Sequence, residues 1–204
     1  MDTIERSTPP RSGSAVPEAV LHTRGRRITV EEYRAMGEAG ILSEDDRVEL
    51  LDGHLISMSP IGPSHAHCVN RLTELFGERN GPSIRLSVQN PVHLDDVSEP
   101  EPDLALYDSD APTDRHLRPD DIVLVVEVAD TSVEYDRDVK SDRYGRAGIP
   151  EYWVVDLANE VVEVFRRPED DGYAERIRHR RGDTLTTPPD LDSLTVDDIL
   201  GEAE

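Results

Sequence analysis

The segment "VVEVADTSVEYDRDVKSDRYGRAGIPEYWVVD", residues 125–156, decides the fold of this chain. It begins inside the longer run "DIVLVVEVAD" (121–130), which is apolar apart from its ends and Glu127 and is typical of a central strand covered on both faces. The polar stretch over 133–147 predicts a helix, and the apolar "EYWVVDL" (151–157) predicts a further strand. A strand, a helix and a strand in succession are typical of an α/β domain.

The chain before residue 100 predicts a tail, two helices and a hairpin. Residues 1–25 are rich in Ser, Pro, Gly and charge without periodicity, which predicts a mobile tail and leaves residues 26–204 as a single domain. Thr29 and the glutamate three residues later form a capping box at the start of a helix. "RVELLDGHLISM" (47–58) alternates around an Asp-Gly turn, which predicts a hairpin, and "SHAHCVNRLTELFGERNG" (64–81) has the period of an amphipathic helix.

Most of the remaining chain predicts strands. Beyond the central segment, the predicted elements are strands over 83–94, 101–108 and 160–168, a hairpin reaching into 173–185, and a terminal helix over 195–204. Together with the helices above, this order predicts an α/β fold in which helices lie on the faces of a mixed β-sheet.

The charge of the chain restricts its partners. The 204 residues include 44 acidic and 22 basic ones, a formal net charge of −22. This balance argues against a general duplex-DNA binder, because affinity for phosphates comes from lysine and arginine. Two interpretations remain: the acidity is a solvated surface that maintains solubility, or the partner is not a nucleic acid.

The sequence shows no targeting or disulfide signal. There is no apolar run long enough to span a membrane, and no positively charged start followed by an apolar stretch. The one cysteine, Cys68, excludes an internal disulfide and a cysteine-based zinc site. We therefore expect a cytoplasmic protein without membrane contacts.

Two carboxylates lie where charged residues are rarely buried unpaired: Asp103 at the start of one predicted strand and Glu127 near the end of the next. If these strands pair antiparallel, the two side chains meet at one edge of the sheet. Adjacent carboxylates ionise together only with a cation between them, and their oxygens suit Mg²⁺ or Mn²⁺. The alternative is structural: Glu127 pairs with a buried arginine and Asp103 caps a turn.

The stretch "YDRDVKSDRY" (135–144) contains Lys140, the only lysine among 22 basic residues. One helical turn separates it from Asp136 on one side and from Tyr144 on the other, so the three share a helix face. A lysine beside metal-binding carboxylates can orient or help to deprotonate the attacking water and can stabilise charge in the transition state. The alternative is that a single lysine escaped an arginine-biased codon usage.

Several motifs together resemble one protein family. They are "PDLAL" (102–106), the segment over 125–156 quoted above, and "RVELLDGHLISMSP" (47–60). These motifs resemble the Uma-two family of restriction-endonuclease-like proteins, within the PD-(D/E)XK nuclease superfamily, and the similarity runs over residues 28–164. The resemblance implies a restriction-endonuclease-like core, in which helices flank a mixed β-sheet, with a divalent metal at one edge of the sheet.

The resemblance also implies roles for individual residues. Asp103 matches the aspartate of the PD element, Glu127 matches the acid of the (D/E)XK element, and Glu49 matches an acid of the N-terminal part as a further metal ligand. The sequence departs from the superfamily pattern at Ala129, where a lysine is expected. In the Uma-two pattern the lysine lies on the following helix, and Lys140 has that position.

The sequence leaves the roles of Tyr144, His65 and Gln89 open. Tyr144 is either a core residue or a supporting one, since its spacing from the lysine resembles the Gln-x-x-x-Tyr helix of RecB-like nucleases. His65 lies at the start of a predicted helix, where it is either a contact of the site or an ordinary helix-end residue, and Gln89 lies on the strand before Asp103 and points either into the cleft or away from it. Arginines gather in one C-terminal stretch, where they could guide a nucleic-acid backbone although acids are interleaved: Arg166, Arg167, Arg176, Arg178, Arg180 and Arg181.

We therefore expect a Mg²⁺- or Mn²⁺-dependent endonuclease, with Asp103 and Glu127 on the metal, Glu49 as a further ligand and Lys140 as the catalytic lysine. The expected substrate is nucleic acid, DNA before RNA, bound weakly or in a structure-specific way because of the acidic charge, and a homodimer is expected. The rival interpretation is a non-cleaving interaction domain that keeps the fold, which the charge of −22 supports. A hydrolase of small phosphorylated molecules is a third interpretation, for which the sequence shows no pocket signature.

Overall fold

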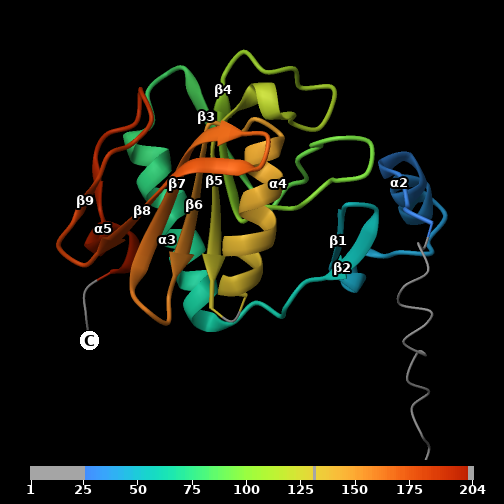
Figure 1. Cartoon of the computed structure of the whole chain (residues 1–204), viewed down its shortest axis with the longest axis horizontal. Helices are drawn as coiled ribbons and strands as arrows, with labels where there is room; N and C mark the ends of the chain where they lie inside the picture. Colours follow the sequence, from blue (N-terminus) through green and yellow to red (C-terminus); the bar gives the residue numbers. More distant parts are fainter. Residues whose placement is uncertain (1–25, 131, 202–204) are drawn as a thin grey trace, which may run out of the picture.

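Helices flank both faces of a six-stranded β-sheet, and a small helix-and-hairpin unit lies beside it (Figure 1). The computed structural model describes residues 26–130 and 132–201. The mobile tail predicted over 1–25 lies outside the described residues. Within the described ranges, no helix is long and apolar enough to cross a membrane.

The elements follow one another in a mixed α/β order. The helices are α2 (Val30–Glu38), α3 (Pro63–Arg79), the π-helix η3 (Tyr135–Lys140) continued by α4 (Ser141–Arg146), and α5 (Val196–Leu200), with short 3-10 turns at Glu44–Asp46 and Pro119–Asp121. The strands are β1 (Val48–Leu51), β2 (His54–Ser57), β3 (Ile84–Val88), β4 (Leu104–Asp108), β5 (Ile122–Ala129), β6 (Glu151–Asp156), β7 (Val161–Glu169), β8 (Gly172–Arg180), β9 (Thr184–Leu185) and β10 (Leu194–Thr195).

The central sheet has the strand order β3-β4-β5-β6-β7-β8. Every neighbouring pair is antiparallel except β5 and β6, which are parallel. A parallel pair needs a crossover connection, and here the helix formed by η3 and α4 provides it. Residues 125–156 thus form the strand–helix–strand unit that their sequence predicts, and the prediction of a mixed sheet flanked by helices is confirmed.

Alternation along β5 divides the core into two layers. Leu124 and Val126 point to the face covered by α3 and α5, whereas Val125 and Ala129 point to the face covered by the η3–α4 helix. Because alternate residues of a strand share a face, Glu127 lies on the η3–α4 side. The register therefore directs the one acid of this apolar run toward that helix.

The unit formed by α2 and the β1–β2 hairpin docks on the loop between β3 and β4. Helix α2 begins with the predicted capping box. Asp52 and Gly53 turn the hairpin with φ of 52° and 75°, a left-handed pair that suits an Asp-Gly turn. The Glu99 amide donates to the Leu50 carbonyl (2.8 Å), so strand β1, which carries Glu49, is fixed beside the sheet.

Three features differ from the sequence prediction. The helix predicted over 133–147 is π-helical over Tyr135–Lys140. Strand β3 ends at Val88 and does not continue to residue 94, because Gln89 has a left-handed backbone with φ of 49° and a proline follows two residues later. The small β9–β10 pair before α5 has no counterpart in the prediction.

Candidate active site

Strands β4 and β5 place Asp103 opposite Glu127. Leu104 pairs with Val126 in the antiparallel register, and the next step toward the sheet edge brings Asp103 beside Glu127. The Asp103 amide donates to Glu127 Oε2 (3.4 Å), and the Val128 amide donates to Asp103 Oδ2 (2.8 Å). The two buried carboxylates therefore meet at one edge of the sheet, as antiparallel pairing of their strands predicts.

The Lys140 ammonium contacts two of the predicted carboxylates. Its Nζ is 2.9 Å from Glu127 Oε1 and 3.1 Å from Glu49 Oε2. The lysine and both glutamates are at most 5 % exposed. Tyr144 also donates to Glu127 Oε1 (3.2 Å), so it is both a core residue and a contact of the site. The structure thus brings Glu49, Asp103, Glu127 and Lys140 together.

Lys140 reaches Glu127 because of the face on which Glu127 lies. Ala129, two residues further along the strand, is buried on the same face under the η3–α4 helix. A lysine at residue 129 would offer its ammonium along the strand, whereas Lys140 offers it from the helix above. An ammonium can reach Glu127 from residue 129 or from residue 140. The site can therefore lack a lysine at residue 129, where the superfamily pattern has one.

The π-helical turn sets the direction of Lys140. The Ser141 amide donates to the Asp136 carbonyl, five residues back, and one residue more per turn rotates the residues that follow by about 100°. The Ser141 hydroxyl donates to the Arg137 carbonyl, and the Tyr152 hydroxyl donates to the Asp136 carbonyl (3.0 Å). These two hydroxyl groups stabilise the turn that directs Lys140 onto the carboxylates.

Glu49 comes from strand β1 and is fixed through both carboxylate oxygens. Oε2 accepts a hydrogen bond from the Glu101 amide (3.2 Å) in addition to its contact with Lys140, and Oε1 accepts one from the Tyr135 hydroxyl (3.4 Å). The Tyr135 ring also lies 5.8 Å from Lys140 Nζ, within range of a cation–π interaction. The hairpin therefore joins the site at the sheet edge through the lysine.

Two residues whose roles the sequence leaves open contact Asp103. His65, in the first turn of α3, places Nε2 3.0 Å from Asp103 Oδ2, and this hydrogen bond raises the pKa of the imidazole against the opposing effect of burial. Gln89 Nε2 lies 3.5 Å from Asp103 Oδ1. Neither contact follows from sequence spacing, because one depends on how α3 packs and the other on the left-handed backbone at Gln89.

The site opens into a cleft of about 420 Å³ in which acids outnumber bases. Six acidic and three basic side chains line it: Glu49, Glu101, Asp103, Glu127, Asp130, Asp136, Arg47, His65 and Lys140. Like charges held this close disfavour each other's ionisation. The cleft is therefore suited to attract a cation.

Burial is the main cause of the raised carboxyl pKa values in the cleft, and neighbouring acids add to it. Burial raises the pKa of Glu127 well above its usual value, and the nearby Lys140 opposes this only in part. Burial also raises the pKa of Glu101 and of Asp136. For Lys140, burial disfavours the charged form, but the surrounding carboxylates, Glu127 first, outweigh it and hold the pKa well above its usual value. The surrounding carboxylates therefore favour the protonated form of Lys140.

The donor set at the sheet edge fits a hard divalent cation held by two carboxylates. Mg²⁺ is commonly bound by one or two carboxylates together with substrate phosphates and waters. Asp103 Oδ1 and Glu127 Oε2 each accept one long hydrogen bond from the described residues, at 3.5 and 3.4 Å. No group of three or more His, Cys, Asp or Glu side chains in the described ranges is arranged to hold a metal ion. Glu49, the predicted third ligand, contacts Lys140.

The C-terminal arginines that the sequence groups together are paired with acids in the fold. Four of the six have carboxylate partners: Arg166 with Glu151, Arg176 and Arg178 with Glu163, and Arg181 with Glu160 and Asp197. Much of their charge is therefore compensated within the protein. The cluster seen in the sequence is not a continuous cationic surface.

The fold and the acidic cleft at its sheet edge define a restriction-endonuclease-like α/β protein. The chain belongs to the Uma2 family: the family model, described as "Putative restriction endonuclease", matches residues 30–198. The resemblance to the Uma-two family is thereby confirmed.

A solved structure shares this fold. The chain is similar to a crystal structure described as "a putative nuclease belonging to DUF820 from Anabaena variabilis", with a TM-score of 0.60 and 13 % sequence identity over 85 % of this chain and 97 % of that one. At this identity the likeness shows the fold alone. No curated protein matches the chain.

Proposed function

We propose that this chain is a Mg²⁺- or Mn²⁺-dependent endonuclease that hydrolyses phosphodiester bonds in DNA. The observation that carries the proposal is the Lys140 ammonium, 2.9 Å from Glu127, at the sheet edge where Glu127 and Asp103 meet. The description of the Uma2 family and the likeness to a protein described as a nuclease support the same class of reaction.

Asp103 and Glu127 would hold the ion, which when bound supplies Lewis-acid activation of the scissile phosphate and of a water molecule. Lys140 has two functions in this arrangement. It fixes Glu127 through Oε1, which leaves Oε2 for the ion, and its ammonium stabilises the charge that develops on the phosphate oxygens. The surrounding carboxylates raise the pKa of Lys140, which favours the protonated form that charge stabilisation requires.

Glu49 and His65 act in this proposal as positioning residues. Glu49 holds the Lys140 ammonium through Oε2, while its Oε1, which accepts one long hydrogen bond from Tyr135 (3.4 Å), would still be available to the ion. His65 and the Val128 amide hold Asp103 Oδ2, which leaves Oδ1 for the ion. Both residues therefore contribute to the orientation of groups that face the substrate.

The acidic charge favours recognition of a particular DNA structure over tight nonspecific binding. A net charge of −22 repels the phosphate backbone at long range. A single-stranded or branched substrate, whose backbone can bend into the cleft, meets less of this repulsion than a straight duplex that lies along the surface. The homodimer and the cytoplasmic location expected from the sequence stay predictions.

The test is cleavage of single-stranded, duplex and branched DNA with Mg²⁺, with Mn²⁺ and with EDTA. Cleavage is expected only with a divalent ion, and Lys140→Ala and Asp103→Asn are each expected to lower the single-turnover rate by about 100-fold or more. Asp156→Asn is the matched control. Asp156 is a buried aspartate at the end of neighbouring β6 whose partners are Arg137 and Asn159, and this variant should cut at close to the wild-type rate.

Two outcomes would change the proposal. Cleavage by Lys140→Ala at the wild-type rate contradicts the role of the lysine. If wild type cuts no substrate, while Mn²⁺ binds to wild type and not to Asp103→Asn, a non-cleaving interaction domain that retains the metal site replaces the nuclease.

A further inference from the structure

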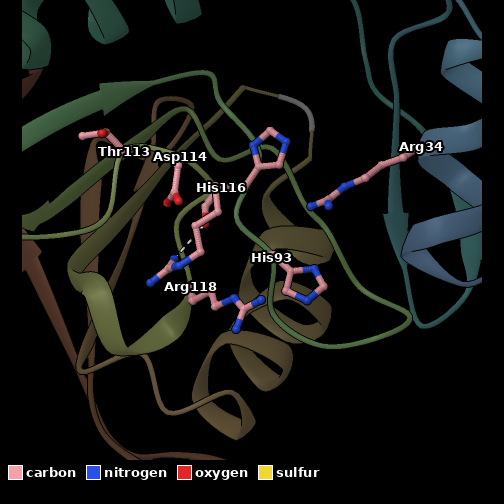
Figure 2. A pocket seen from close by; sticks show the side chains of 7 residues that line it. Arg34, His93, Thr113, Asp114, His116 and Arg118 are labelled. Atoms are coloured by element: carbon pink, nitrogen blue, oxygen red, sulfur yellow. Dashed lines mark hydrogen bonds between the residues drawn. The ribbon is translucent and has the colours of Figure 1, made fainter.

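A second cleft, of about 530 Å³, lies between α2, the loop before β4 and the loop before β5. In Figure 2, Arg34 extends from α2 toward the imidazole rings of His93 and His116, and Arg118 approaches the same space from the other side. Its charged or titratable lining residues are Arg34, His93, Asp114, Arg115, His116 and Arg118.

The lining of this cleft has more basic than acidic side chains, the reverse of the chain as a whole. Acidic residues outnumber basic ones by 44 to 22 in the sequence, yet the lining has three arginines, two histidines and one aspartate. Helix α2, the residue at position 93 and the loop over 113–118 are well separated along the chain. The gathering of basic groups is therefore a product of the fold.

Several hydrogen-bond donors of the cleft are not used by the protein itself. Among the described residues, Arg118 and His116 have no carboxylate within ion-pair distance. The His93 Nδ1 atom is buried without a hydrogen-bond partner in the same part of the chain, and Glu99 Oε1 lies 3.7 Å from it. Arg118 and His116 are therefore the basic groups of the lining that no acid among the described residues compensates.

The other two arginines are held in place by acids. Arg34 pairs with Glu99, and Arg115 forms a two-bond contact with Asp121 (2.6 and 3.0 Å). A guanidinium has five donors, so a carboxylate on one edge leaves other N–H groups for a ligand. These ion pairs therefore fix the direction of the two arginines and reduce the entropy lost when a ligand binds.

The side chains that line this cleft are suited to bind a phosphate group. Guanidinium groups match phosphate oxygens in planar, two-bond geometry, and a hydroxyl donor, Thr113, lies in the same lining. None of the lining side chains is aliphatic, so an apolar ligand has nothing to pack against, and the arginines repel a cation.

The loop over 91–103 connects this cleft to the candidate active site. The Val92 amide donates to the Pro100 carbonyl (2.9 Å). His93, next to Val92, lines the basic cleft, and Glu101, next to Pro100, lines the acidic one. Covalent geometry then limits the distance between the Cα atoms of His93 and Glu101 to about 14 Å. Because successive phosphates of one duplex strand are about 3.4 Å apart along the axis, this distance corresponds to about four nucleotides of one strand.

We propose that this basic cleft binds a backbone phosphate of the nucleic acid whose scissile bond lies in the candidate active site. The identity of the ligand rests on the proposed function, whereas affinity for phosphate as such does not. Arg118, the lining arginine without a carboxylate partner among the described residues, supplies local positive charge that a chain of net charge −22 needs in order to hold a polyanion. The cleft also fixes the direction in which the strand leaves the site.

Binding of inorganic phosphate in EDTA, followed by ³¹P NMR, tests the cleft without any cleavage. Arg118→Gln removes an exposed guanidinium and should weaken phosphate binding about tenfold, the contribution of one charge-assisted hydrogen bond. Arg180→Gln is the matched control: Arg180 is exposed on β8 and has no ion pair in the described part of the chain, and the net charge changes equally. This control should bind phosphate as wild type does. Asp114→Asn removes the one acid of the lining and should tighten binding.

Oligonucleotides identify the source of the phosphate. Fluorescence anisotropy compares single-stranded DNA with a 5′-phosphate and the same strand with a 5′-hydroxyl, again in EDTA. If the cleft binds a backbone phosphate, Arg118→Gln should weaken binding of both strands equally. If the variant weakens binding of the 5′-phosphorylated strand alone, the ligand is a terminal phosphate and the assignment is overturned. Equal effects of Arg118→Gln and Arg180→Gln on inorganic phosphate overturn the site itself. A wild type that cuts no DNA but binds phosphate through Arg118 upholds the anion site and contradicts only the proposed function.

Discussion

Two charged clusters, each centred on a buried ion, flank the π-helical turn, and their compositions are opposite. In the lysine cluster, one ammonium, that of Lys140, contacts Glu49 and Glu127. In the arginine cluster, one carboxylate, that of Glu163 on β7, contacts three guanidinium groups: Arg137, Arg176 and Arg178. The π-helix supplies a cation to each cluster, since Lys140 and Arg137 both belong to it.

The pKa values show the effect of this difference. In the arginine cluster, burial acts to raise the pKa of Glu163, but the arginines outweigh it and hold the pKa below its usual value. In the lysine cluster, burial raises the pKa of Glu127 well above its usual value in spite of Lys140. The carboxylate of the arginine cluster is fully compensated, whereas the lysine cluster has more acid than its one ammonium can neutralise.

The two clusters also differ in their access to solvent. Lys140 and its carboxylates line the cleft of about 420 Å³. Glu163 is fully buried, and the half-exposed Arg176 and Arg178 close its cluster toward solvent. The arginine cluster, whose charges are paired within the protein, stabilises the fold. The lysine cluster has too little positive charge and borders a cleft, so it is the candidate catalytic site.

Removal of Lys140 is expected to have the largest effect and to separate the two clusters most clearly. Lys140→Met leaves Glu49 and Glu127 buried without a counter-ion, which should lower the free energy of unfolding by about 3–5 kcal/mol. Urea unfolding in EDTA at pH 7.5 measures this loss. The loss should be smaller at pH 5. The folded-state pKa of Glu127 is raised, so its carboxyl stabilises the fold fully below pH 4.5, its unfolded pKa. This contribution is lost as the pH rises through the folded-state pKa.

The double variant Lys140→Met/Glu127→Gln controls for lost packing. It replaces both members of the closest ion pair by neutral side chains, which is far less costly than leaving one charge unpaired. Part of the stability should therefore return. A double variant no more stable than Lys140→Met would show that the lysine stabilises the fold by its packing and not by its charge.

Glu163→Gln should have a smaller effect on stability and none on chemistry. It leaves the arginines without their shared carboxylate and should cost about 2 kcal/mol at pH 7, less than the loss of Lys140, because Arg176 and Arg178 are half exposed and regain water. The pKa of Glu163 is lowered, so its contribution is complete above the unfolded value of 4.5 and is lost as pH falls through the folded value. Unfolding curves of wild type and variant should therefore converge in acid.

The DNA cleavage rate per folded molecule is the second measurement on Glu163→Gln. It should equal that of wild type, since the arginine cluster does not line the cleft of the candidate active site. A loss comparable to that of Lys140→Ala would mean that the two clusters act as one unit through the π-helix, and the distinction between them would fail.

The fold follows from the sequence where local pattern and tertiary packing agree. The apolar run of β5, the capping box of α2 and the Asp-Gly turn of the hairpin each specify one structure locally, and each forms as predicted. The π-helix is different. It depends on a hydroxyl from Tyr152, which lies on another strand, and the periodicity of its own residues resembles that of an ordinary helix. Such a feature cannot be predicted from the segment alone.

Some contacts of the candidate active site can likewise be predicted from the sequence, and others cannot. Asp103, Glu127 and Lys140 could be predicted to lie together, because one strand pairing and one following helix bring them together. The contacts of Glu49 and His65 depend on how the hairpin and α3 dock at the sheet edge. The basic cleft depends on three separated segments, whereas arginines that are neighbours in sequence meet acids from adjacent strands. Proximity along the chain is therefore a poor guide to free positive charge in this protein.

The smallest expected effect belongs to the π-helical turn that serves both clusters. Tyr152→Phe removes the hydroxyl that donates to the Asp136 carbonyl and should cost about 1 kcal/mol of unfolding free energy. With the turn less firmly held, kcat for DNA cleavage should fall while KM is unchanged, because Lys140 acts on bound substrate. Tyr173→Phe is the matched control, since Tyr173 stacks on Tyr152 (6.4 Å between centroids) and its buried hydroxyl has no partner among the described residues.

A readout independent of cleavage comes from the composition of the chain. Lys140 is the only lysine, so protein grown with lysine that is ¹³C-labelled at Cε alone gives one side-chain NMR signal, and its titration reports the pKa of Lys140 alone. In wild type the pKa should lie above the ordinary value, because the carboxylates outweigh burial. In Tyr152→Phe it should fall toward that value as Lys140 loses contact with Glu49 and Glu127, and in Tyr173→Phe it should not change. An unchanged signal in Tyr152→Phe would show that the turn and the position of the Lys140 ammonium do not depend on the Tyr152 hydroxyl.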